Sequence, residues 1–157
     1  MKHAALFASA LFAWLGLSTL SVGAQPDRKN YAQQLVDETL AKHPEVIILA
    51  MHVKSPTDAE YPIVASNIGR IGKKADEDDM RVINTGKPNL EVNEAGNHFE
   101  VELTLQDASR RTIGALGVVF NYKQGDDKAA FQKKAEQVRD ELRARIPTEK
   151  MLFAPAK

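Results

Sequence analysis

The most regular stretch of the sequence reads HFEVELTL and runs from His98 to Leu105. Every second residue from Phe99 onward is apolar, and the residues between them are polar or charged. This period of two predicts a β-strand with one face in the core and the other face polar. Such strands are typical of antiparallel sheets, which bury one face and leave the other accessible to water.

The segments on either side extend this strand into a sheet with helices. Further strands are expected over residues 46–53, 61–66, 90–92 and 111–122. Helices are expected over residues 31–42, from Asp76 to the stop at Gly86, and from Gly125 to the stop at Pro147. Because short turns join the strands, the order predicts an α+β fold, an antiparallel sheet of about five strands flanked by N-terminal and C-terminal helices.

The first and last predicted helices carry apolar stripes that suit the apolar face of this strand. Leu35 and Leu40 recur at helical spacing in the first helix, and Phe131, Val138 and Leu142 do so in the last. We therefore expect these helices to bury the apolar half of the alternating strand.

The amino terminus has the pattern of a secretory signal peptide. Lys2 supplies a positive charge, an uncharged run extends from Ala4 to Val22, and the small residues up to Ala24 form a cleavage site. We expect cleavage before Gln25 and a periplasmic or secreted protein with no membrane span after cleavage; an uncleaved membrane anchor is the alternative. The expected organisation is a signal peptide over residues 1–24, one domain over residues 25–147 and a C-terminal tail over residues 148–157.

The composition excludes several classes of function. The chain has no cysteine, which rules out disulfides, thiol catalysis, iron–sulfur clusters and c-type haem attachment. Its 21 basic and 21 acidic residues leave it near neutral, which gives no support to nucleic-acid binding. No nucleophile–base arrangement or cofactor motif stands out, so we expect neither catalysis nor a cofactor.

A series of short motifs resembles a family of sensor domains. The motifs are Ser66-Asn67, the Arg70-Ile71-Gly72-Lys73 stretch, Asp78-Asp79 before Thr85-Gly86, and the strand from Ile113 to Val119 with Gly114 and Gly117. In this order they resemble the extracellular PAS-like, or Cache, sensor domains, in particular the periplasmic domains of citrate- and C4-dicarboxylate-sensing histidine kinases. The resemblance implies a PAS-like/Cache sheet and a small-molecule pocket. It also implies a sensing role.

The departures from that family change the expected ligand. The strand positions that carry a basic clamp in the carboxylate sensors fall on Glu100 and Glu102, and the position of a histidine falls on Asn67. Two carboxylates repel a third, so a cationic or neutral ligand is expected. Because no kinase part follows in the sequence, we expect a stand-alone module that passes its signal to a separate membrane receptor.

The candidate ligand-binding residues are Ser66, Asn67, Arg70, His98, Glu100 and Glu102. For the glutamates and His98, a merely solvated sheet face is the alternative interpretation. Arg70, Lys73 and Lys74 flank glycines in a loop and could hold an anion, but a solvated loop charge explains them better because no phosphate-loop pattern is present.

Two other groups have a structural interpretation. His52 in the first strand is expected to be a satisfied structural histidine rather than a metal or haem ligand. The acidic run from Asp76 to Asp79 is expected to cap a helix, because it lacks the ligand spacing of a calcium loop.

The expected function is therefore small-molecule binding, for sensing or scavenging. A protein–protein adaptor with an empty pocket is one alternative, since a fold does not determine a function. A small exported enzyme with an unrecognised site is the other.

Overall fold

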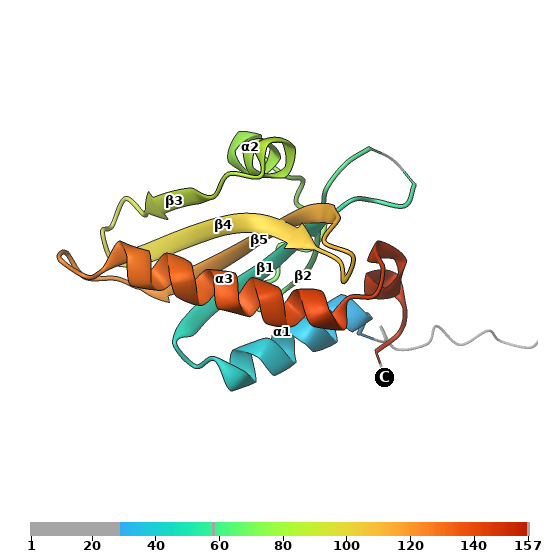
Figure 1. The fold of residues 1–157 in the computed structure, drawn as a ribbon, viewed down its shortest axis with the longest axis horizontal. Coiled ribbons are helices and arrows are strands. Elements are labelled where there is room, and N and C mark those ends of the chain that lie inside the picture. The colour runs from blue at the N-terminus through green and yellow to red at the C-terminus, as the bar shows by residue number, and fades with distance from the viewer. Residues whose placement is uncertain (1–28, 58, 157) are drawn as a thin grey trace, which may run out of the picture.

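The structure is a computed structural model that describes residues 29–57 and 59–156. The predicted signal peptide, residues 1–24, lies outside the described residues. The described chain folds into an antiparallel sheet with helices on both faces (Figure 1).

The sheet has five strands in the spatial order β2-β1-β5-β4-β3. Its strands are β1 (Val46–Val53), β2 (Ile63–Ser66), β3 (Asn89–Val92), β4 (His98–Gln106) and β5 (Thr112–Asn121). All neighbours pair antiparallel. The predicted α+β class and the five predicted strands are confirmed; β2 is shorter than expected because Pro62, which has no backbone N–H, precedes it.

Helices α1 (Tyr31–Lys42) and α3 (Lys128–Arg145) lie side by side on one face of the sheet (Figure 1). The alternating apolar residues of β4 are at most 1% exposed beneath them, so the predicted face of the strand is confirmed. Leu35, Val138 and Leu142 join these residues in one core cluster, while Leu40 and Phe131 pack at its margin. The third helix, α2 (Glu77–Thr85), lies over the opposite face, against β4 and β5.

Helix α2 begins and ends where local chemistry predicts. The side chain of Asp76 accepts a hydrogen bond from the Asp79 N–H, and the Asp79 carboxylate accepts one from the Asp76 N–H, which forms a capping box. At the other end Gly86 adopts a left-handed conformation with φ of 71°. Asp127 caps α3 in a similar way by accepting from the N–H groups of Ala129 and Ala130.

A close approach between β1 and β5 depends on Gly114. It pairs with Val53, and a Cβ atom at this position would lie 1.8 Å from the carbonyl oxygen of His52. The absence of a side chain therefore allows the two central strands to pair along their full length.

Residues 149–153 form a short 3₁₀-helix, η1, in the segment that the sequence leaves as a tail. Leu152 is fully buried in the core cluster. Tyr31 donates its N–H to the Ala154 carbonyl, which ties the segment to the start of α1.

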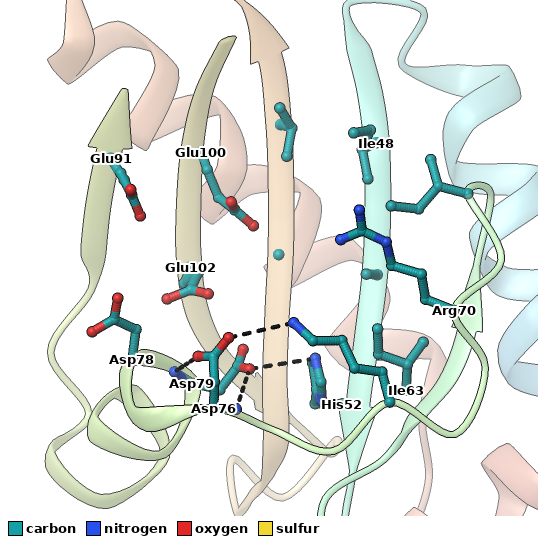
Figure 2. A pocket seen from close by; sticks show the side chains of 15 residues that line it. Ile48, His52, Ile63, Arg70, Asp76, Asp78, Asp79, Glu91, Glu100 and Glu102 are labelled. Atoms are coloured by element: carbon teal, nitrogen blue, oxygen red, sulfur yellow. Dashed lines mark hydrogen bonds and ion pairs between the residues drawn. The ribbon is translucent and has the colours of Figure 1, made fainter. Parts of the chain in front are cut away.

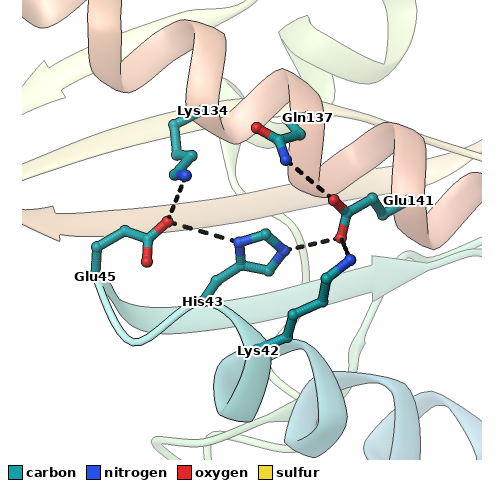
Figure 3. A network of polar contacts seen from close by, with 6 residues as sticks. All are labelled: Lys42, His43, Glu45, Lys134, Gln137 and Glu141. Atoms are coloured by element: carbon teal, nitrogen blue, oxygen red, sulfur yellow. Dashed lines mark hydrogen bonds and ion pairs between the residues drawn. The ribbon is translucent and has the colours of Figure 1, made fainter.

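A polar network fastens the end of α1 to α3 (Figure 3). Glu141 of α3 accepts hydrogen bonds from Lys42 Nζ and pairs with His43 Nε2, each at 2.8 Å. Glu45 lies 2.9 Å from Lys134 Nζ. Lys42 and then His43 hold the pKa of Glu141 down at about 2. The charges here are compensated within the network, so we interpret it as structural.

Candidate ligand-binding cavity under helix α2

A cavity of about 240 Å³ lies between the polar face of the sheet and α2 (Figure 2). All five strands of the sheet contribute lining residues, and the loop of residues 67–74 forms another wall. The cavity exists because α2 and this loop cover the sheet face that alternation predicts to be polar. Glu100 and Glu102 therefore face a partly covered cavity, in which both side chains are half-buried.

One wall of the cavity is acidic. Three of its carboxylates belong to strands and three to the start of α2: Glu91, Glu100, Glu102, Asp76, Asp78 and Asp79. We call this set the acidic wall. Coulomb repulsion among like charges in a partly dehydrated space is unfavourable, and it is relieved when a carboxyl group takes up a proton or a cation binds.

The strand carboxylates of the acidic wall show this repulsion. Burial raises the pKa of Glu102 to about 8, and the charge of Asp79 adds to it, against a hydrogen bond donated by Asn89 at 3.1 Å. Burial and then the neighbouring charge of Glu91 also raise the pKa of Glu100. In the part of the chain that the structure describes, the side-chain carboxylates of Glu91 and Glu100 have no hydrogen-bond or ion-pair partner.

The helix carboxylates, in contrast, have protein partners. Asp79 Oδ2 lies 3.4 Å from His52 Nε2, and both side chains are only 7% exposed. Asp76 lies 3.4 Å from Lys73 Nζ, and Asp78 accepts from Arg81 at 2.7 Å. The uncompensated negative charge is therefore concentrated on the strand side of the cavity.

The wall opposite the strand carboxylates is basic and apolar. The guanidinium of Arg70 points into the cavity, with the side chains of Ile48 and Ile63 nearby (Figure 2). Arg70 is a non-glycine residue with φ of 61°, next to Gly69 at 73°. Its guanidinium makes no hydrogen bond or ion pair to any residue within the described ranges.

Gly117 of β5 provides room for Glu100. A Cβ atom on Gly117 would lie 3.0 Å from Oε1 of that glutamate. A side chain at this position would therefore push the carboxylate out of its present place in the cavity.

The structure brings only part of the predicted set together. Arg70, Glu100 and Glu102 line the cavity. His98 lines an adjoining hollow that shares Glu91 and Glu100 with it.

Ser66 and Asn67 are not among the residues that line it. Ser66 is buried and its Oγ accepts from the N–H of Ile68 at 3.1 Å. The amide of Asn67 accepts from the Leu49 N–H and donates to the Ile47 carbonyl, so it completes the edge of β1.

For several residues that line the cavity, the sequence pattern indicated only a structural role. His52 is satisfied as expected, since Nδ1 donates to the Tyr61 carbonyl at 2.8 Å, yet it also lines the cavity. Asp76 and Asp79 cap α2 as expected and contribute to the acidic wall as well. Lys73, which fits a solvated loop charge, is a lining residue too. Only the position of α2 over the sheet reveals these second roles.

Among the side chains that the structure describes, no three His, Asp or Glu residues are arranged to hold a metal ion. Over residues 29–57 and 59–156, no helix combines the length and the hydropathy needed to cross a bilayer.

No known family model and no curated protein matches the sequence. The structure, however, is similar to solved domains. The GAF domain of A. aeolicus nlh2, solved in an inactive state, superposes with a TM-score of 0.58 at 11% identity over 73% of this chain and 83% of that one. The repressor BlcR of Agobacterium tumefaciens gives a TM-score of 0.51 at 8% identity over 80% of this chain and 68% of that one. At these identities the likeness concerns the fold alone, and the chain has a fold of the GAF and PAS-like type.

Proposed function

We propose that this chain is a small-molecule sensor domain that binds a ligand with a cationic group in the cavity under α2. The observation that carries the proposal is Glu100, a carboxylate without a partner among the described residues, inside a cavity with five other carboxylates. A cation placed there is attracted by several charges at once, in a space where water screens them less than in bulk.

The nature of the neighbours supports a binding role. One structural neighbour is the GAF domain of A. aeolicus nlh2, which was solved in an inactive state. The second neighbour, BlcR, is named as a repressor. Sites for drug-sized ligands have volumes of roughly 300–1,000 Å³. The cavity is slightly smaller, at about 240 Å³, and is therefore suited to a metabolite that is smaller than a drug.

We also propose that the protein is exported and that its domain is of the Cache type. Residues 1–24 have the pattern of a cleaved signal peptide, and the sensor motifs of the sequence resemble those of Cache domains. The domain would then act in the periplasm or outside the cell and pass its signal to a separate membrane receptor. Sequencing the amino terminus of the protein isolated from cells tests this part: we expect Gln25, and an intact Met1 in a membrane fraction would contradict it.

A thermal-shift screen tests the binding role, because a ligand that binds only the folded state raises the melting temperature. We expect amines to stabilise the protein and citrate, malate and succinate to have no effect. Glu100→Gln removes the uncompensated charge and is expected to weaken the response to amines. Glu94→Gln makes the same change in the exposed turn between β3 and β4 and is expected to leave the response unchanged. Stabilisation by a dicarboxylate, or equal responses in the two variants, would contradict the proposal.

A further inference from the structure

The cavity under α2 has two chemically different ends. The strand carboxylates Glu91, Glu100 and Glu102 form one end, and the guanidinium of Arg70 lies at the other (Figure 2). Glu100 and Arg70 both point into the space between them, and neither has an ion-pair partner in the described part of the chain. The pocket therefore presents a free anion and a free cation to the same ligand.

The basic end is held by the backbone of its loop. The N–H of Ile63 donates to the Lys73 carbonyl at 2.8 Å, and the N–H of Gly72 donates back to the Ile63 carbonyl at 2.9 Å. A third bond, from the Lys73 N–H to the Arg70 carbonyl at 2.9 Å, closes the turn that carries the guanidinium. Arg70 itself adopts a left-handed conformation, which non-glycine residues rarely adopt. The loop is thus pinned to β2 in a form that directs Arg70 over the cavity.

Between the charged ends the cavity is apolar. Ile48 and Val119 come from the central strands, Ile63 comes from β2 and Ile68 comes from the loop. This surface is suited to the aliphatic part of a small molecule, whose burial is favourable. Gly117 lies in the same stretch of β5 and leaves the space over the strand open.

We propose that the ligand is an amino acid or a closely related zwitterion, with its ammonium group at Glu100 and Glu102 and its carboxylate at Arg70. The inference rests on the proposed function, because it specifies the ligand of the same cavity. A purely cationic amine would satisfy the acidic end and leave Arg70 unpaired. A dicarboxylate would satisfy Arg70 and be repelled at the other end. Only a molecule with both charges compensates both ends.

The guanidinium is well suited to this role. Its planar fork donates two parallel hydrogen bonds to one carboxylate, which fixes the orientation of the ligand as well as its charge. Lys73 comes from the same loop, but its ammonium lies 3.4 Å from Asp76 of the acidic wall and is paired there. The surplus of carboxylates at the opposite end favours amino acids with a second amino or guanidino group.

Matched pairs of ligands separate this inference from the proposed function. Lysine and cadaverine, or arginine and agmatine, differ by one carboxylate and share their amino groups. Melting temperature and calorimetric affinity are measured for both members of each pair with the unaltered protein and with Arg70→Gln. Arg110→Gln is the matched control, because Arg110 is also an exposed arginine with a left-handed backbone, at φ of 65°, and lies outside the cavity.

We expect the amino acid of each pair to bind more tightly than the decarboxylated amine. Arg70→Gln should weaken binding of the amino acid by about ten- to a hundredfold, the range for a hydrogen bond between charged groups, and should leave the amine unchanged. Arg110→Gln should change neither.

If the amines bind as well as the amino acids and Arg70→Gln has no effect, the inference is wrong and the cationic site stands. If neither class binds, both fail. Circular dichroism of each variant verifies that it is folded.

Discussion

Glu102→Gln provides the most direct test of the electrostatics of the cavity. Glu102 lies on β4 beneath α2, where it faces Asp76 and Asp79 from the helix, Glu100 from its own strand and the Asn89 amide from β3. Burial, followed by the charge of Asp79, raises its pKa from the ordinary 4.5 to about 8. Gln has the same shape and keeps an oxygen that accepts from Asn89, but it carries no charge.

The sign of the effect follows from the direction of the pKa change. A carboxyl whose pKa is raised on folding favours the folded state while it is protonated, and this contribution is lost as pH rises from 4.5 to about 8. A pKa difference of this size corresponds to roughly 5 kcal/mol without screening. Because the side chain is partly accessible to water, we discount this strongly and expect Glu102→Gln to stabilise the protein by on the order of 1 kcal/mol at pH 9. At pH 4 the two proteins should be equally stable.

Urea unfolding at a series of pH values between 4 and 9 measures this difference directly. Glu94→Gln in the exposed turn provides the control, and its effect should not grow with pH in the same range. The explanation is refuted if Glu102→Gln is destabilising at pH 9, or if its effect is the same at pH 4 and pH 9. Either result would mean that Glu102 is stably ionised in the folded protein.

Three further substitutions test the scaffold by denaturant unfolding. Leu103→Ala removes a core side chain that is 1% exposed and should cost about 2–5 kcal/mol; a loss below about 0.5 kcal/mol would reverse the assigned face of β4. Gly114→Ala would place a Cβ atom 1.8 Å from the His52 carbonyl oxygen and should cost about 3 kcal/mol or more, whereas a neutral result would show that the central strands separate easily. Glu141→Gln should destabilise the protein near neutral pH, because Lys42 and His43 lower the pKa of Glu141 to about 2, and the difference should shrink as pH falls from 4.5 toward 2.

Local sequence patterns predict helices α1 to α3, the five strands and their order, whereas η1 lies in the segment predicted as a tail. The helix at 31–42 and the strand at 46–53 have the predicted bounds. Periodicity, caps and stops act over a few neighbouring residues, as the Asp76–Asp79 capping box shows for α2. The alternation in β4 likewise determined which of its side chains enter the core.

The cavity, in contrast, forms only through the tertiary structure. Nothing local indicates that α2 packs over the polar face of β4 and β5, because this placement depends on contacts such as that between His52 and Asp79. The same packing brings Arg70 opposite Glu100, 30 residues away in the chain. It also makes the polar face of β4 part of the lining of a pocket, although the alternation in the sequence fits a solvated face as well. Local patterns describe one element at a time, whereas a site made from a loop, a helix and five strands exists only when long-range packing assembles them.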